Sequence, residues 1–287
     1  MTRLALVTCL DQPGLTSDDE LLSQALQAEG VEVCALAWNN AQVDWSPFDG
    51  ILIRSAWDYH QHLNAFMKWI AEIEASGVSL WNAPDTLRWN VNKTYLRHLA
   101  EAGVATVPTH WIGQGAENVD VHGIMQSRGW TDVVLKPAVS AGGRGVTRYK
   151  EGDPVPSVVE LTAATAQSEL MLQPFLPEID RGELSFILLH GELSHVVRKM
   201  PKQGDFRVQA KFGGSVERVD PAPSMVEQAM QAAAVAGNPL YARVDGLDID
   251  GQLLVMELEL IEPDLFFHAA PESAARMAAV LARTIRP

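Results

Sequence analysis

Residues 4–81 alternate between short runs of apolar residues and segments whose apolar residues recur at helical spacing. Such apolar runs are typical of buried strands, and the helical segments end at Gly30 and Gly77, which are common stop signals. Ser17, followed by Glu20 three positions later, predicts a capping box at the start of the first helix. Strands that alternate with helices indicate a parallel α/β layer. The predicted strands lie at 4–9, 31–36, within 48–54 and at 78–81, with helices at 17–30 and 66–75.

Beyond residue 90 the pattern changes to isolated helices and antiparallel pairs of strands. A helix is predicted for Asn92–Gly103, and the residues 183–199 read as two strands joined at 190–192. The segment 241–262 reads as a second pair that turns at Asp250-Gly251, a favoured hairpin dipeptide. The other predicted elements are strands at 133–136 and 170–176 and helices at 119–127, 155–167 and 226–235.

Composition narrows the class of protein. The 287 residues are 47% hydrophobic and 20% charged, which is typical of a globular chain of two or three subdomains. A formal charge of −14 argues against a surface that coats nucleic acid, because phosphate contacts need clustered lysine and arginine. The two cysteines, Cys9 and Cys34, lie in apolar runs, as buried free thiols do in a reducing compartment. With no apolar run of membrane-spanning length and no signal peptide, we expect a cytoplasmic protein.

A lysine at the end of a predicted strand precedes a loop of small residues. Lys136 ends the strand 133–136, and the loop Ser140–Gly145 contains three glycines, a hydroxyl group and Arg144. Glycine allows backbone N–H groups to turn toward an anion and tolerates positive φ, so this stretch is a candidate phosphate site. It is not a P-loop, because that motif places Gly-Lys-Ser/Thr at the entry to a helix. An ordinary glycine turn beside a surface lysine is the alternative.

Other candidate binding residues follow strand ends and helix starts. Arg54 and Asp58 follow the third strand, at the sheet edge where ligands collect. Arg54 would bind a substrate carboxylate and Asp58 an amine, or the two would form an internal pair. Lys93 lies in the first turn of the predicted helix, where a cation is unfavourable unless an anion binds there; a solvated lysine is the alternative. The segment 173–176 would face a flat heteroaromatic base or serve as a plain linker.

The hairpin at 241–262 carries the most specific signal in the sequence. Arg243 and Asp245 share one face of their strand, as do Glu257 and Glu259 of the next strand, because each pair is two residues apart. Three acids among apolar residues with few cations would repel one another and lose hydration. A hard divalent cation relieves that cost, and Mg²⁺ prefers oxygen ligands. The hairpin therefore predicts a magnesium site.

In this order along the chain, the features resemble the ATP-grasp superfamily, in particular its glutathione synthetase and ribosomal-protein glutamate ligase branch. The motifs that carry this resemblance are Gln173-Pro-Phe-Leu-Pro-Glu, Arg198-Lys-Met-Pro, Gly204-Asp-Phe-Arg207 and Met256-Glu-Leu-Glu259. The stretches Arg54-Ser-Ala-Trp-Asp-Tyr59 and Glu259-Leu-Ile-Glu-Pro-Asp-Leu265 also resemble a subgroup that includes the cyclo-ligase of the D-cycloserine ring.

The resemblance implies an α/β (α+β) ATP-grasp fold. Residues 1–88 would form an N-terminal parallel, Rossmann-like substrate domain. Residues 89–172 would form a central subdomain with the glycine loop, and residues 173–287 a C-terminal subdomain with the metal hairpin. The last two would clamp ATP between them.

Roles for individual residues follow from the same resemblance. ATP would be bound by Lys93, Lys136, Ser140, Gly142, Gly143, Gln173, Phe175, Leu176 and Glu183. Two Mg²⁺ ions would be bound by Asp245, Glu257 and Glu259. Catalytic charge neutralisation would come from Arg207, Arg243 and Lys136. The substrate would contact Arg54, Asp58, Tyr59 and Arg198.

The implied activity is ATP- and Mg²⁺-dependent ligation of a carboxylate and an amine through an acyl-phosphate, on an amino-acid-like molecule, in amino-acid metabolism or antibiotic biosynthesis. Two alternatives stay open: a cyclo-ligase that closes a ring within one ureido amino acid, and an ATP-binding module without catalysis. Glu259 stands where family members usually have Asn, which leaves the number of metal ions open. We expect a small-molecule substrate, no nucleic acid or membrane partner, and a homodimer or homotetramer.

Overall fold

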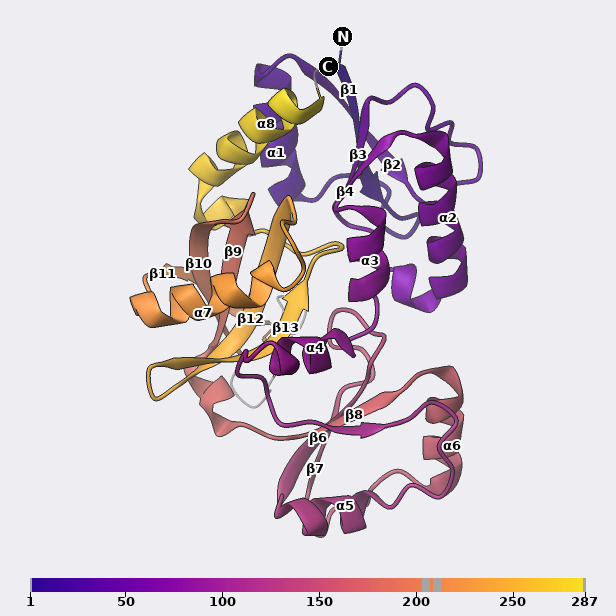
Figure 1. Ribbon diagram of the computed structural model, residues 1–287, viewed down its shortest axis with the longest axis vertical. Coiled ribbons are helices and arrows are strands. Elements are labelled where there is room, and N and C mark those ends of the chain that lie inside the picture. The colour runs from indigo at the N-terminus through magenta and orange to yellow at the C-terminus, as the bar shows by residue number, and fades with distance from the viewer. Residues whose placement is uncertain (1, 203–206, 209–212, 286–287) are drawn as a thin grey trace.

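The computed structural model describes residues 2–202, 207–208 and 213–285 (Figure 1). Its described strands form one parallel sheet, of order β2-β1-β3-β4, and two antiparallel sheets, of orders β5-β8-β6-β7 and β11-β10-β9-β12-β13. The predicted mixed α/β fold is therefore confirmed. Residues 204–206 of the Gly204-Asp-Phe-Arg207 motif lie outside the described residues.

The N-terminal sheet is covered by helices on both faces because its two central strands are apolar on both faces, at residues 4–7 and 51–53. Leu4 and Leu6 pack toward α1 and α8, whereas Ala5 and Val7 pack toward α2 with its aromatic residues. The elements are β1 (Thr2–Thr8), α1 (Ser17–Ala28), β2 (Val31–Ala37), β3 (Gly50–Ile53), the 3₁₀ turn η1 (Tyr59–Gln61), α2 (Leu63–Ser76), β4 (Ser79–Trp81) and α3 (Pro84–Asn90).

The first helix starts one residue away from the predicted position. Thr16, not Ser17, is the N-cap, and its hydroxyl accepts a hydrogen bond from the backbone N–H of Asp19 at 3.0 Å. The predicted capping box with Glu20 is wrong because Asp19 takes the third helical position, while its carboxylate also pairs with Arg54. Glu20 points to solvent.

The second sheet lies at the other end of the molecule from the N-terminal layer (Figure 1). Its apolar face, which includes Val133, Leu135 and Leu172, packs on α5 and α6. By alternation, Val134 and Lys136 point from the opposite face toward the C-terminal sheet and line a cavity there. The elements are α4 (Tyr95–Glu101), β5 (His110–Ile112), α5 (Val121–Arg128), β6 (Asp132–Pro137), β7 (Thr147–Lys150), α6 (Val158–Gln167) and β8 (Leu170–Pro174).

The C-terminal sheet contains both predicted hairpins. Its turn at Asp250 and Gly251 has positive φ at both residues, 52° and 82°, as the dipeptide predicts. Helix α7 packs on one face, and α8 packs against part of the other. The elements are η2 (Pro177–Arg181), β9 (Glu183–Leu189), β10 (Glu192–Met200), β11 (Ser215–Val219), α7 (Pro223–Ala234), β12 (Tyr241–Ile249), β13 (Gln252–Glu259), η4 (Phe267–Ala269) and α8 (Pro271–Ile285).

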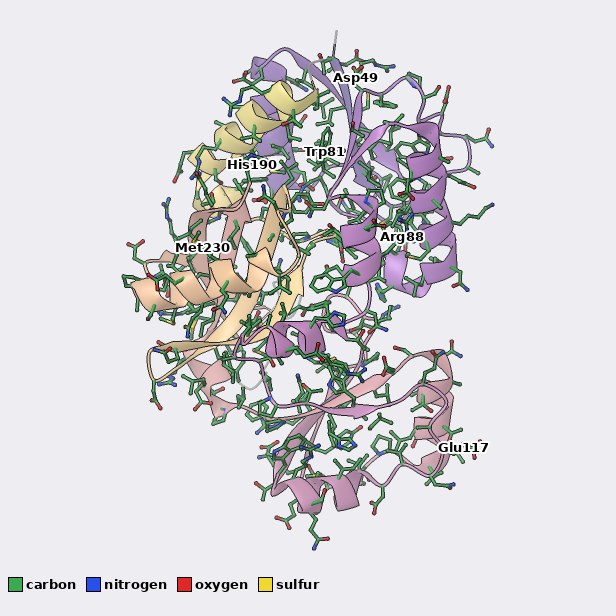
Figure 2. The ribbon with its side chains drawn as sticks, in the orientation of Figure 1. Asp49, Trp81, Arg88, Glu117, His190 and Met230 are labelled. Atoms are coloured by element: carbon green, nitrogen blue, oxygen red, sulfur yellow. The ribbon has the colours of Figure 1, made fainter. Side chains whose placement is uncertain are left out.

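Polar groups of β12 and of the N-terminal layer join these two parts of the molecule. Tyr241 Oη lies 2.7 Å from the carbonyl oxygen of Ile261 and 3.1 Å from that of Ile53. Asn82 donates to the carbonyl oxygens of Tyr241 and Leu260. Figure 2 shows side chains filling the space between these layers around the labelled Trp81. Helix α8 returns to pack along α1, so the two ends of the chain lie near each other (Figure 1).

Candidate functional site

A cavity of about 540 Å³ lies between the second sheet and the C-terminal sheet. Its wall is built from the ends of β6 and β8, the glycine loop, and the faces of β9, β12 and β13. The following predicted site residues line it: Tyr59, Lys93, Lys136, Ser140, Gly142, Gly143, Gln173, Phe175, Leu176, Glu183, Arg207, Arg243, Asp245, Glu257 and Glu259. Residues from three parts of the chain thus meet around one space.

Lys93 connects the glycine loop to the acidic hairpin. Its Nζ donates to the carbonyl oxygen of Ser140 at 2.6 Å and lies 2.9 Å from Glu257 Oε1. The predicted helix start at Asn92 is wrong, because α4 begins only at Tyr95. Asn92 Oδ1 instead accepts from the Thr94 N–H, and the Lys93 N–H donates to the carbonyl oxygen of Ala138. These bonds hold Lys93 in a turn, with its side chain buried.

Lys136 is buried in the cavity wall with less compensation for its charge. Burial lowers the pKa of its ammonium group, with Lys93 acting in the same direction and Glu257 and Glu183 opposing it. Burial disfavours the charged form of Lys93 too. There, however, Glu257 outweighs burial and raises the pKa of Lys93. An anion entering the cavity would therefore gain most from Lys136.

The glycine loop takes the backbone conformations that its composition predicts. Gly142, Gly143 and Gly145 have φ values of 60°, 72° and 73°, a region that other residues rarely adopt. At the loop start, the Ser140 hydroxyl donates to the carbonyl oxygen of Pro137 at 3.2 Å. The loop therefore folds back over the end of β6 beside Lys136.

The acidic hairpin is more strongly neutralised than the sequence predicts. Asp245 accepts from Arg243 Nη2 at 2.9 Å, lies 3.2 Å from Lys199 Nζ, and accepts from the Ser185 hydroxyl. Although burial opposes ionisation, these partners hold the pKa of Asp245 well below its usual range. Among the described residues, no three His, Cys, Asp or Glu side chains gather as a ready-made metal site. The predicted trio of bare acids is therefore corrected: Asp245 belongs to an ion-pair network.

The side chains of Glu257 and Glu259 line the cavity and are partly exposed to it. In the antiparallel register Asp245 faces Glu257 and Arg243 faces Glu259. Glu259 Oε1 accepts from Arg243 Nη2 at 2.5 Å. Burial raises the pKa of Glu259 to about 7, with Glu257 and Asp245 adding to the rise and Arg243 opposing it. For Glu257, burial is outweighed by Lys93 and Lys136, which lower its pKa.

Lys199 and Glu262 line the same cavity and were not predicted. Lys199 pairs with Glu183 and Asp245, and its side chain is 7% exposed. Glu262 is buried just after β13, and burial together with Glu259 raises the pKa of its carboxyl group well above the usual range. The sequence signal for Lys199 was its position next to Arg198: neighbouring residues on a strand point to opposite faces, so only one of the two could face the cavity.

Three predicted substrate residues do not line this cavity. Arg198 points to the other face of the sheet and pairs with Glu217 of β11 at 3.4 Å. Asp58 is 4% exposed and accepts from Trp38 Nε1 and Asn39 Nδ2, so its carboxylate serves the interior of the N-terminal layer. Arg54 pairs with Asp19 at 2.8 Å, not with Asp58, and lines a neighbouring pocket. The alternative of an internal Arg54–Asp58 pair is therefore wrong.

The opposite end of the cavity is more apolar. Phe175 and Leu176 follow β8 there, and the Arg148 guanidinium lies 3.3 Å from the centre of the Phe175 ring. Gln173 Nε2 donates to Thr109 Oγ1 at 2.8 Å, which fixes its side chain in the wall. A cavity with an apolar end and an opposite end of paired cations and acids suits a ligand that is part aromatic ring and part polyanion.

Comparison with known proteins agrees with this geometry. Residues 105–263, more than half of the chain, match the family described as prokaryotic glutathione synthetase, ATP-grasp domain. The chain belongs to the ATP-grasp ligases. Residues 4–82 of this ligase match a second family, described as D-cycloserine synthetase DcsG, N-terminal domain.

Individual relatives cover most of the ligase. The cycloserine biosynthesis protein DcsG of Streptomyces lavendulae is 29% identical over an alignment of 299 positions, which spans 99% of each chain. A glutathione synthetase of Prochlorococcus marinus subsp. pastoris is 28% identical over 219 residues, 69% of this chain and 66% of the relative. The crystal structure of D-cycloserine synthetase DcsG matches with a TM-score of 0.88 at 26% identity, over 99% of this chain and 100% of that one.

These relatives establish the class of reaction. The protein is an ATP-dependent ligase of a family that forms amide bonds, as its sequence predicts. ATP-grasp ligases generally use ATP and Mg²⁺, and these relatives act on small amino-acid molecules. Within the described residues, no helix combines the length and the apolar character needed to cross a bilayer. The domain boundaries, the homodimer or homotetramer and the individual site residues stay predictions.

Proposed function

We propose that this ligase activates the carboxyl group of one amino-acid-like molecule with ATP and then closes a ring within it, as a cyclo-ligase of the D-cycloserine type. The observation that carries the proposal is the match of residues 4–82 to the N-terminal domain of D-cycloserine synthetase. The N-terminal layer contributes Trp57 and Tyr59 to the cavity wall, outside the part of the chain that matches the ATP-grasp domain. The full-length similarity to DcsG supports the same substrate class.

ATP would lie along the cavity with its base at the apolar end. Phe175 and Leu176 would contact the adenine, and Glu183, beside Lys199, would accept hydrogen bonds from the ribose. Lys93, Lys136 and the backbone of the glycine loop would meet the phosphates. This direction places the γ-phosphate near Arg243 and Arg207, which both line the cavity.

The residues at the phosphate end fit Mg²⁺. Glu257 and Glu259 present side chains that are 28% and 26% exposed, and Mg²⁺ usually takes one or two carboxylates together with substrate phosphates. When bound there, Mg²⁺ would offset the negative charge of the β- and γ-phosphates. Burial raises the pKa of Glu259, and repulsion by Glu257 and Asp245 adds to the rise; such an ion would relieve that repulsion. We retain the prediction of two ions, with Glu257 and Glu259 as ligands.

The chemistry proceeds in two displacements. An oxygen of the substrate carboxylate bonds to the γ-phosphorus, the bond from that phosphorus to the bridging oxygen breaks, and ADP leaves. A nitrogen of the same molecule then bonds to the carbonyl carbon of the acyl-phosphate, the bond from that carbon to the phosphate oxygen breaks, and the proton lost by the nitrogen leaves with the inorganic phosphate. Lys136, Arg207 and Arg243 would disperse the charge of the first transition state. The glycine loop would exclude water, which otherwise hydrolyses the acyl-phosphate.

The experiment supplies ATP, Mg²⁺ and one candidate substrate at a time, including a ureido amino acid, without any second amine. We expect ADP and phosphate to form together with a cyclic product detected by mass spectrometry. Turnover that requires a separate amine would indicate the intermolecular ligase instead. The variant Glu257→Gln should lose at least about a hundredfold in kcat/KM, as removal of a transition-state contact does. The surface variant Glu72→Gln, which removes only an exposed pair with Lys68, serves as the matched control.

A further inference from the structure

One histidine, His60 of η1, lies in the wall of the main cavity. Among the described residues it is the only histidine that lines this space. The residues before it anchor the turn: Tyr59 is buried in the hydrophobic cluster of the N-terminal layer, and the Asp58 carboxylate accepts from Trp38 and Asn39. These contacts fix the turn that carries the imidazole ring.

The imidazole ring of His60 has unused hydrogen-bonding groups. Although the side chain as a whole is only partly buried, Nδ1 and Nε2 are both buried, and neither has a hydrogen-bond partner among the described residues. Most buried polar side-chain atoms in native structures do have a partner. A neutral imidazole carries one N–H donor and one nitrogen that accepts, so His60 holds an unused donor and an unused proton acceptor.

The glycine loop closes onto this part of the wall. Ala141 packs against the hydrophobic cluster that contains Tyr59, and Ser140–Arg144 line the cavity beside it. Arg144 lies near enough to His60 to affect the ionisation of the ring. The loop that would exclude water from the acyl-phosphate therefore meets the N-terminal layer at the turn that carries His60. A substrate held between the loop and this layer would have its acyl-phosphate next to the imidazole ring.

The charges around the ring favour its neutral form. Burial lowers the pKa of His60, and Arg144 and Lys93 act in the same direction. The backbone of Trp57 and the carboxylate of Asp58 oppose this fall. The charged groups that face the ring thus come from the glycine loop, from the turn before α4 and from its own turn. With its pKa lowered, the imidazole is neutral at neutral pH and able to accept a proton.

We propose that His60 is a further catalytic residue of the ligase, whose ring accepts the proton that the attacking nitrogen of the substrate loses in the second displacement. This role rests on the proposed function and identifies the base for its ring-closing step. The lone pair of the nitrogen forms the bond to the carbonyl carbon, and the electrons of the N–H bond stay on the nitrogen as the proton passes to the imidazole. The bond from the carbonyl carbon to the phosphate oxygen breaks, and the imidazolium gives its proton to the released phosphate. The imidazole is then neutral again, so the step needs no other reactant.

The test separates the two displacements in a single turnover of the intact protein with ATP, Mg²⁺ and a ureido amino acid. Formation of ADP does not involve the proton of the attacking nitrogen. In His60→Gln we expect the rate of ADP formation to stay within about twofold of the wild type, while ring formation falls by about a hundredfold, as loss of a general base does. Chemical quenching measures both products. His62→Gln removes an exposed histidine outside the cavity wall and should change neither rate, and thermal melting checks that both variants fold.

The pH dependence of the wild type tests the same role without any variant. Because the base must be neutral, ring formation relative to ADP formation should be constant above about pH 6.5 and should fall below it as His60 takes up a proton. The same ratio in His60→Gln should not change over this range. A wild-type ratio that stays constant down to pH 5, or that rises as the pH falls, would contradict the assignment.

A structural role of His60 would give a different result. Equal losses of ADP formation and ring formation in His60→Gln would overturn the proposal, as would ring formation at the wild-type rate. Failure of the proposed function is distinguishable from both, because the wild type would then form an amide only when a separate amine is supplied. The ratio of that amide to ADP in His60→Gln then decides the role of His60, since a separate amine must also lose a proton as its bond forms.

Discussion

Two buried lysines face the same cavity but differ in the partners that hold their charge. Lys93 has a carboxylate at 2.9 Å and a carbonyl oxygen at 2.6 Å. Among the described residues Lys136 has only the longer-range attraction of Glu257 and Glu183, which does not offset its burial. A buried charge without close partners costs free energy in the folded protein, and a bound polyphosphate would offset that cost.

Lys136→Ala should therefore separate catalysis from stability. We expect kcat/KM for ATP to fall by about a hundredfold or more, because a cation beside the transferring phosphate is lost. The melting temperature should not fall, because the removed charge lacks a close partner. Coupled measurement of ADP release and a thermal melt test both statements. Lys150→Ala, at the exposed end of β7, is the control, and a large loss of stability in Lys136→Ala alone would refute the argument.

At the scale of single residues, the sequence predicts the kind of chemistry at the site better than it predicts which residues line the cavity. Lys93, Lys136 and Glu257 meet in one cavity, as their motif order predicts. Alternation on β10 separates Arg198 from Lys199 but does not say which face lies under α7; Val196 packs on the α7 side and Val197 on the other. Glu262 and Asp264 lie in the stretch 259–265 that carries part of the family resemblance, but the stretch does not reveal that they line the cavity, because their environment is assembled from segments far apart in the chain.

At the scale of elements, an irregularity in the β12–β13 pair positions the acidic residues. The register shifts between Asp245 and Gly246, so that Asp245 faces Glu257 whereas Gly246 faces Val255. Sequence reasoning identified both strands and their turn but not this bulge, although the apolar alternation changes phase there: Leu253 and Val255 are buried before it and Leu258 after it. Asp245 reaches Ser185 because the two residues are paired across β12 and β9, and Lys199 of β10 lies 3.2 Å from its carboxylate.

Gly246→Ala should damage both stability and activity. A Cβ at this position would lie 2.6 Å from the carbonyl oxygen of Leu254, so a backbone atom would have to move. We expect the free energy of unfolding to fall by about 1–3 kcal/mol, with a loss of ATP turnover as Asp245 and Glu257 shift. Gly113→Ala has no heavy atom within 4 Å of the added Cβ and should be near neutral. Denaturant unfolding and turnover of the two variants measure the contrast.

At the scale of the whole molecule, the hydrophobic clusters do not follow the three sheets one by one. One cluster combines Leu4 and Leu6 of the N-terminal sheet with Ile187 of the C-terminal sheet and Leu281 of α8. The second sheet instead has a cluster of its own with α5 and α6. The sequence predicts successive subdomains, but it does not predict that the last helix returns to the first, because that contact depends on the chain's path as a whole.

Leucine truncations should reveal which parts of the molecule unfold together. Leu281→Ala creates a space in the shared cluster and should cost about 2–5 kcal/mol; hydrogen exchange should then accelerate in β1 and β9 at once. Leu161→Ala makes the matched change on α6. The Leu161 side chain is 2% exposed and belongs to the separate cluster, so this variant should accelerate exchange in β6 and β8 only. The second sheet can then open without the other two, which is the motion that would admit ATP to a cavity lying between it and the C-terminal sheet. Acceleration of β6 and β8 by Leu281→Ala, equal to that of β1, would mean that the cavity walls open together with the rest of the fold.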